Sequence, residues 1–139
     1  MEENELCVTT QDHARLCRYL AEAGQRDPKA EEALRLLAEE LCGRRLVDQR
    51  EIGPEVVTMH SRVLLRDIAT KEDLALTLVY PDDADLREGK LSVATPLGAA
   101  LLGSARGAVL EWRPSPRRLR RLLVKAVMFQ PEAAGNYSL

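Results

Sequence analysis

Residues 57–67 read VTMHSRVLLRD. Every second side chain from Val57 to Leu65 is apolar or small, and polar or charged side chains occupy most of the positions between them. A period of two predicts a β-strand with one mostly apolar face, because successive side chains of a strand point to opposite sides. The fold is therefore built on a sheet, and the apolar face of that sheet needs a covering layer.

The chain downstream of this strand continues with similar signals. Thr95-Pro96 places a helix-capping residue before a proline, which is tolerated in the first helical turn, and Gly103 closes the short helix that follows. Together these signals predict an antiparallel sheet with one helix on its face. The predicted elements are, in order, strands at 74–80 and 91–93, a helix at 97–102, and strands at 108–112 and 119–129 that pair across a turn at 113–116.

The first 53 residues have a helical period instead. Thr9 and Asp12 form a capping pair, and apolar residues then recur at helical spacing up to residue 23. Asp27-Pro28 starts a second helix, and the turn before it is short, so two arms of about 14 residues, roughly 20 Å each, should lie antiparallel. We expect residues 1–53 to form this helical hairpin and a polar linker, and residues 54–139 to form the sheet domain.

The composition is that of an ordinary globular protein. Of 139 residues, 45% are apolar and 30% are charged, and a net charge of −2 argues against a bulk nucleic-acid binder. Residues 1–55 hold 13 acidic and 8 basic side chains, whereas residues 56–139 carry a net charge of +3. No apolar run approaches the ~18 residues of a membrane span, and the N-terminus lacks a signal-peptide pattern. With three cysteines in no disulfide pattern, we expect a cytoplasmic protein without membrane contact.

The sheet region carries four motifs: VTMHSRVLLRD (57–67), TLVYP (77–81), LSVATPLGAALLG (91–103) and QPEAAG (130–135). They resemble the C-terminal domain of the bacterial Gre transcript-cleavage factors, and most closely the Rnk branch of that family, the regulators of nucleoside diphosphate kinase. The resemblance implies an α+β fold, in which a short antiparallel helical hairpin (a coiled coil) precedes an FKBP-like antiparallel sheet with one short helix. It also implies that the partner is RNA polymerase, with nucleic acid reached only through the polymerase.

The resemblance points to one loop as the binding site. In Gre factors the equivalent loop meets a coiled-coil rim of the polymerase β′ subunit beside the secondary channel. Carried over by motif, Thr95 and Pro96 would lie at that contact, with Leu97 and Leu101 close to it. Position 94 is alanine here, whereas Gre factors usually carry aspartate or asparagine. Helix capping and core packing are the alternative explanation for the same residues.

The hairpin tip is the second region to which the resemblance points. Gre factors carry two acidic residues at the tip of a much longer coiled coil, where they help to hold a catalytic magnesium. Here the tip offers Asp27 and Glu31, which also fit the cap and first turn of the second helix. The arms are too short to cross the channel. We therefore predict a regulator that docks on RNA polymerase without stimulating cleavage and competes with Gre factors; a Gre-like cleavage stimulator is the alternative.

Enzymatic chemistry has little support in the sequence. FKBP-type prolyl isomerases line their pocket with several aromatic side chains, whereas Tyr80, Trp112 and Phe129 are expected in the core. His60 falls on the polar side of the first strand and is expected at the surface. The chain has no catalytic motif or glycine-rich phosphate loop. We predict no enzyme activity and no cofactor, with prolyl isomerisation as a less favoured alternative.

Two clusters of reactive or charged residues have structural explanations. His13 and Cys17 share a helical face with Cys42 ending the next helix, but this spacing lacks the paired ligands of a zinc site. We therefore expect no metal, and instead buried thiols and a surface histidine. A run of arginines could contact phosphates, but no aromatic residue interleaves it, so a solvated strand edge is favoured. The run comprises Arg113, Arg117, Arg118, Arg120 and Arg121.

Overall fold

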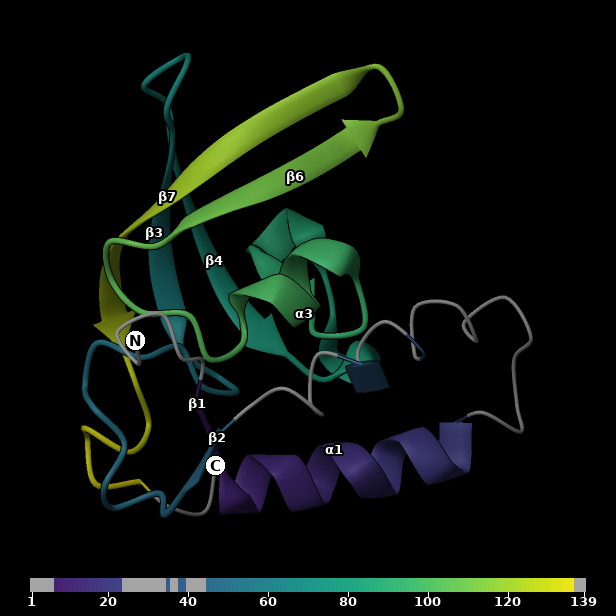
Figure 1. Cartoon of the computed structure of the whole chain (residues 1–139), viewed down its shortest axis with the longest axis vertical. Helices are drawn as coiled ribbons and strands as arrows, with labels where there is room; N and C mark the ends of the chain where they lie inside the picture. The colour runs from purple at the N-terminus through teal and green to yellow at the C-terminus, as the bar shows by residue number, and fades with distance from the viewer. Residues whose placement is uncertain (1–6, 24–34, 36–37, 40–44, 137–139) are drawn as a thin grey trace.

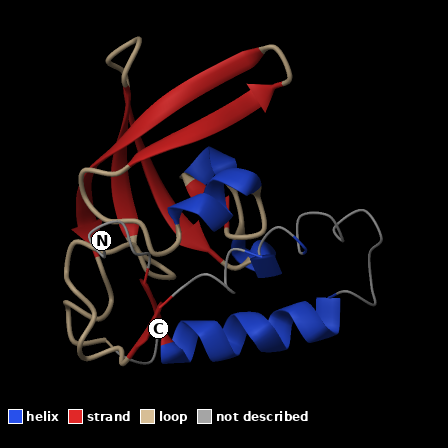
Figure 2. Cartoon of the chain, viewed as in Figure 1, coloured by secondary structure: helices blue, strands red, loops and turns tan. Residues whose placement is uncertain are grey.

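A five-stranded sheet forms the centre of the molecule (Figures 1 and 2). The computed structural model describes residues 7–23, 35, 38–39 and 45–136. Every strand predicted for the sheet region is present, with shifted boundaries, and the last two form the predicted antiparallel pair. In order across the sheet, the strands are β5 (Lys90–Ser92), β4 (Asp73–Val79), β3 (Arg62–Asp67), β7 (Arg118–Phe129) and β6 (Val109–Ser115).

One strand pair departs from the predicted antiparallel sheet. β4 and β5 run parallel, with Thr77 beside Lys90. The acidic segment between them passes through two short 3-10 turns, η3 (Pro81–Asp83) and η4 (Leu86–Glu88), and Gly89 leaves the second turn with a φ of 74°. These turns carry the chain back along β4, so β5 enters in the same direction as its neighbour. The residue pattern of a strand does not record the direction of its partner, and the prediction was wrong for this pair.

β3 and β7 bend the sheet. Their register shifts between Arg62 and Val63 and again between Leu64 and Leu65, and such irregularities increase the local twist of a strand pair. The sheet curls around α3 (Pro96–Leu101), which lies in its hollow and packs against β6 (Figures 1 and 2). The predicted short helix is confirmed.

The first predicted strand is shorter than its pattern suggested. β3 begins at Arg62, and residues 57–61 form a turn in which Ser61 N–H donates to the Thr58 carbonyl at 3.0 Å. Thr58 and its two neighbours in the chain are all buried. The alternation of apolar and polar residues therefore does not correspond to a buried face and an exposed face of a strand. His60 lies in the left-handed region with a φ of 68°, which ends any regular strand before it.

The N-terminal segment is a short strand followed by a helix. β1 (Cys7–Thr9) pairs in parallel with β2 (Arg45–Val47), within a stretch that was expected to be an unpaired linker. α1 (Thr10–Ala23) is the predicted first arm, and its 14 residues correspond to about 21 Å. The tip with Asp27 and Glu31, Cys42, and all of the second arm except residues 35, 38 and 39, which are helical, lie outside the described residues. No helix in the described part of the chain is long and apolar enough to span a membrane.

A single buried apolar cluster joins all these layers. Val8 of β1 and Leu16 of α1 belong to it, together with Leu97 and Leu101 of α3. The N-terminal segment therefore shares its core with the sheet, which explains how a helix of this length is stabilised. The strands contribute Val63, Leu65, Leu76, Leu78, Leu91, Leu122 and Val124.

Candidate functional site

The Thr95–Pro96 turn is held rigidly where β5 leads into α3. Thr95 Oγ1 donates to the Ser92 carbonyl at 2.7 Å and accepts from Gly98 N–H at 3.0 Å, so one hydroxyl fixes both sides of the turn. Ala94 N–H donates to Ser92 Oγ at 3.0 Å. Pro96 occupies the first helical turn, where its fixed φ suits a helix and no N–H partner is needed. The predicted capping role of Thr95 is confirmed.

Buried residues anchor this turn from below. Leu97 and Leu101 are 4% and 0% exposed, so they fix the turn but do not reach the surface. Gly98 is required because a Cβ at this position would lie 2.0 Å from the Ser92 carbonyl oxygen. Of the four residues to which the resemblance points, only Pro96, which is exposed, and Thr95, which is half-buried, can contact a partner.

A cavity of about 380 Å³ lies beside the turn. Thr95 and Ser92 line one side of it, and the segment from Ala84 to Arg87 lines the other. Leu86 in that segment is 72% exposed, the highest exposure among the large apolar side chains that the structure describes. The sequence analysis missed Leu86, although a single leucine within the acidic run DDADLRE is a recognisable signal.

The segment 82–90 beside this cavity carries more acidic than basic side chains, whereas the charged residues that line the cavity itself are Asp85, Arg87 and Lys90. Asp82 and Asp83 are exposed, while Asp85 Oδ1 accepts from the backbone N–H of Arg87 at 3.0 Å and caps η4. Glu88 forms a surface ion pair with Lys90 at 3.3 Å. A partner at this surface would therefore meet more negative than positive charge.

A buried carboxylate joins α1 to the turn that precedes β3. Asp12 is 3% exposed, and its Oδ2 accepts from Met59 N–H at 3.1 Å. Burial raises the pKa of Asp12 to about 6, and the charge of Glu132 adds to the rise. Tyr80 lies within the field of the same carboxylate, and its pKa is raised to about 12, mainly by burial. Asp12 was predicted only as part of a cap, so its link to Met59 is a finding of the structure.

The QPEAAG motif fastens the C-terminus to the same turn. Gln130 Nε2 donates to the carbonyls of Gly53 and Val56, at 2.7 Å in each case. Glu132 Oε1 accepts from the Thr58 hydroxyl at 2.7 Å. The motif therefore fixes residues 53–58 against the end of β7, and its role is structural.

The aromatic residues and His60 differ from their predicted positions. Phe129 is 40% exposed and was wrongly assigned to the core, whereas Tyr80 and Trp112 pack against the core as expected. His60 is half-buried, 5.6 Å from the Tyr80 ring, and burial lowers its pKa, so the expectation of a surface position was wrong. His60 and Phe129 line a cavity of about 460 Å³ together with Arg62. Three such residue types around an open cavity do not define a catalytic arrangement.

Of the candidate zinc ligands, His13 and Cys17 lie in the described part of the chain, and they do not form a metal site there. Cys17 Sγ lies 3.6 Å from His13 Nδ1, and both residues belong to one exposed face of α1. Within the described residues, no group of three or more His, Cys, Asp or Glu side chains could hold a metal ion. Cys17 is exposed, so the expectation of buried thiols was wrong for this residue.

Comparison with known proteins defines the class to which this fold and site belong. The family model described as "Transcription elongation factor, GreA/GreB, C-term" matches residues 49–128, which include the whole of β3 and the Thr95–Pro96 turn. Because the match spans more than half of the chain, the chain belongs to this family.

Individual relatives place the chain within that family. It is 39% identical over 100 residues to the "Regulator of nucleoside diphosphate kinase" of Escherichia coli (strain K12), covering 72% of this chain and 74% of the relative. It is 32% identical over 89 residues to "Transcription elongation factor GreA" of Chloroherpeton thalassium, covering 64% and 56%. The solved structure of a "Prokaryotic transcription elongation factor GreA/GreB from Nitrosomonas europaea" superposes with a TM-score of 0.73 at 35% identity, covering 91% of this chain and 100% of that chain. The resemblance read from the four motifs is confirmed.

Proposed function

We propose that this protein is a transcription regulator that binds RNA polymerase beside the secondary channel through the Thr95–Pro96 turn. It does so without stimulating transcript cleavage, and it competes with Gre factors for the same position. Membership of the GreA/GreB family supports the transcription role. The polymerase contact is carried over from the loop that Gre factors use.

The geometry of the turn is the observation that carries this proposal. Pro96 is exposed at the start of α3, while the hydrogen bonds of Thr95 and the burial of Leu97 hold the backbone beneath it. A rigid, exposed element loses little conformational freedom when a partner binds, so more of the contact energy is retained as affinity. Ala94 is half-buried and engages Ser92 through its backbone, so its small side chain leaves the turn intact.

The surface beside the turn supports the same proposal. Leu86 supplies an apolar contact that lines the cavity, and the exposed Asp82 and Asp83 of the same segment add negative charge to this surface. Apolar contacts ringed by charges are typical of docking surfaces, in which the buried centre gives affinity and the rim gives orientation. A positively charged rim on the polymerase would complement this surface.

The length of α1 supports docking without cleavage. An arm of 14 residues reaches about 21 Å. Docking through the Thr95–Pro96 turn does not need the hairpin to extend to the catalytic centre of the polymerase. Asp27 and Glu31 are proposed to serve as helix cap and first-turn acid of the second arm, as the sequence indicates. The protein would then occupy the channel mouth and exclude longer-armed factors.

The test is binding to core RNA polymerase by the wild type, Pro96→Ala and Pro54→Ala. Pro54 is also exposed but lies away from the residues that line the turn and its cavity, so Pro54→Ala controls for the loss of a proline. We expect Pro96→Ala to weaken binding by about tenfold, as for a central contact, and Pro54→Ala to leave it unchanged. A Gre factor should displace the wild type.

A transcript-cleavage assay on a stalled elongation complex then completes the test. We expect no stimulation by this protein, and inhibition of Gre-stimulated cleavage in proportion to its concentration. Stimulated cleavage would make the protein a Gre-like factor. Absence of polymerase binding at low salt, or equal weakening by both proline variants, would refute docking through this turn.

A further inference from the structure

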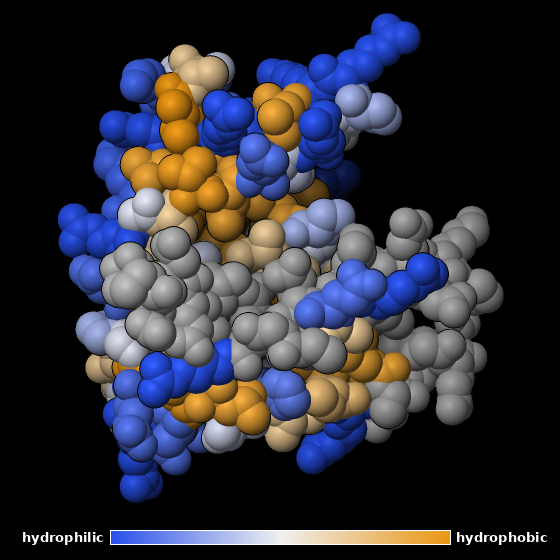
Figure 3. Space-filling view, in the orientation of Figure 1, coloured by the Kyte–Doolittle hydropathy of each residue, from blue (hydrophilic) through white to orange (hydrophobic). Residues whose placement is uncertain are grey.

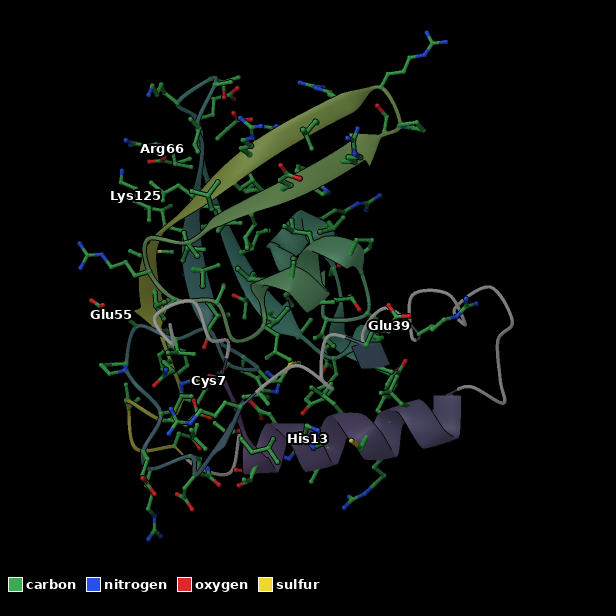
Figure 4. All side chains as sticks on the ribbon, in the orientation of Figure 1. Cys7, His13, Glu39, Glu55, Arg66 and Lys125 are labelled. Atoms are coloured by element: carbon green, nitrogen blue, oxygen red, sulfur yellow. The ribbon has the colours of Figure 1, made fainter. Side chains whose placement is uncertain are left out.

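The free end of the β6–β7 hairpin carries five arginines within nine residues. The hairpin projects past α3, and hydrophilic side chains extend outward from its end (Figures 1 and 3). Figure 4 shows long side chains with nitrogen at their tips pointing into solvent there. We define the arginine end as the four members of the run that are exposed: Arg113, Arg117, Arg118 and Arg121.

The fifth arginine has a different role, within the fold. Arg120 donates to the buried carboxylate of Asp67, and this hydrogen bond lowers the pKa of that carboxyl. Its guanidinium carbon also lies 5.4 Å from the ring centroid of Trp112, across the strand pair. One arginine of the run is therefore needed for stability, and that role gives no reason for the other four.

Several basic side chains elsewhere in the described part of the chain have carboxylate partners. Arg66 and Lys125 share Asp73, at 2.8 Å and 3.4 Å, and Figure 4 shows them projecting together from neighbouring strands. Arg106 pairs with Glu55 at 3.1 Å.

The arginine end has no comparable set of acids. Arg121 approaches Glu111 at 3.8 Å, but both side chains are more than 60% exposed, so this pair is weak. Among the residues that the structure describes, no carboxylate lies within ion-pair distance of Arg113, Arg117 or Arg118. Three exposed guanidinium groups without a carboxylate partner, beside a weakly paired fourth, leave this end of the two-stranded ribbon positively charged and open to an anion.

We propose that the arginine end contacts the phosphate backbone of a double-stranded nucleic acid, independently of base sequence. The guanidinium group matches phosphate oxygens in geometry and is always charged. A duplex presents about one negative charge per 1.7 Å of its axis, a denser and more regular array than a protein surface offers. A two-stranded ribbon also has the dimensions to lie along a groove.

The surroundings of the arginine end favour a duplex over a single strand. Single strands are bound mainly by stacking bases on exposed aromatic side chains. Trp112 is the aromatic residue near the arginine end, and it is half-buried with Arg120 over its ring, whereas the exposed Phe129 lies at the opposite end of β7. Stacking is thus unavailable at this site, whereas phosphate contacts need only exposed cations. The inference does not rest on polymerase binding, because it uses a different surface.

Direct binding tests the proposal with the full chain and no polymerase. Fluorescence anisotropy is measured with a labelled DNA duplex, the corresponding single strand, and polyglutamate as an acidic polypeptide. The variant is Arg117→Gln/Arg118→Gln/Arg121→Gln. The control, Arg62→Gln/Arg87→Gln/Arg106→Gln, removes the same net charge from exposed positions elsewhere. Thermal unfolding of all three proteins establishes that each remains folded.

The wild type should bind the duplex weakly, at micromolar or higher concentrations in low salt, and more tightly than the single strand. Three phosphate contacts correspond to a slope of about −3 in log affinity against log salt. We expect the arginine-end variant to lose about tenfold in affinity and most of this slope, and the control to lose much less. Equal losses in the two variants, preference for the single strand, or binding to polyglutamate alone would overturn the proposal, as would no binding at low salt.

Discussion

At the residue scale, Asp12 shows how one side chain can join two parts of a fold. Its backbone N–H donates to the Thr9 cap, while its carboxylate accepts from Met59 N–H. Burial raises its pKa from 3.8 to about 6, against the opposing effect of the Met59 hydrogen bond. The folded protein therefore holds this proton more tightly than the unfolded chain does. The stabilisation is complete below pH 3.8 and is lost as the pH rises through about 6.

We predict that Asp12→Asn stabilises the protein at neutral pH and flattens its pH dependence between about pH 4 and pH 7. The pKa shift corresponds to about 3 kcal/mol between the two protonation states, which is the upper limit of the gain. Asparagine keeps an oxygen for Met59 N–H and cannot ionise. Urea unfolding monitored by Trp112 fluorescence at several pH values measures the effect.

Asp82→Asn is the matched control for this prediction, because Asp82 is exposed. It should leave the pH dependence of the unfolding free energy unchanged. If the Asp12 variant and the wild type lose stability in parallel from pH 5 to pH 7, the carboxylate is not the titrating group.

At the element scale, the position of α3 depends on its close approach to β5. Thr95-Pro96 is readable as a helix start in the sequence, but the requirement for Gly98 is not. A Cβ there would meet the Ser92 carbonyl oxygen at 2.0 Å and the Val93 Cα at 2.9 Å. These are backbone atoms, which cannot move aside as a flexible side chain would, so the helix itself would have to shift.

Gly98→Ala is therefore predicted to lower the free energy of unfolding by about 2–3 kcal/mol, despite the higher helix propensity of alanine. It should also weaken polymerase binding in the assay proposed above, because a shift of the helix would move the backbone N–H of residue 98, which alanine retains, away from the Thr95 hydroxyl that accepts from it. Gly53→Ala is the control, since its Cβ would lie 3.7 Å from Val56 Cγ2 in ordinary contact. Equal unfolding free energies for the two variants would show that the helix has room to move.

At the scale of the whole molecule, the N-terminal segment and the sheet form one core. Leu16 of α1 is 0% exposed and belongs to the same cluster as Val57 and Leu101. Gly103 allows β1 to pass closely, since its φ is 83° and a Cβ would lie 2.4 Å from the Cys7 carbonyl oxygen. We therefore propose that the division of the chain near residue 53 separates two topological parts of one folding unit. Both parts should unfold together in one cooperative transition.

Leu16→Ala is predicted to destabilise the entire protein by about 2–5 kcal/mol, the usual cost of a large cavity in a core. Loss of helical signal and the change in Trp112 fluorescence should shift together to lower urea concentration. Leu46→Ala is the control, because Leu46 is 50% exposed and its truncation should cost much less. A loss of helix that leaves the Trp112 transition in place would instead make α1 an independent appendage.

Much of this protein was readable from its sequence because the signals are local. The capping hydroxyl of Thr95, the first-turn proline and the period of two along β4 each depend on residues a few positions apart. The helix at 10–23, the pair β6–β7 and the family follow from such patterns. The likeness to Gre factors is likewise carried by short motifs that stay intact in this chain.

Only the tertiary structure decided the features that join distant residues. The parallel direction of β5, the turn at 57–61 and the burial of Asp12 each depend on contacts between segments far apart in the chain. Gln130 binds carbonyls 77 and 74 residues away, which no local pattern can indicate. The exposure of Leu86, and the absence of a carboxylate partner for Arg113, Arg117 and Arg118 among the described residues, are also properties of the packed surface. Local sequence thus determined the elements and the family. Long-range hydrogen bonds and packing determined the site, because these contacts form only when distant segments come together in the folded chain.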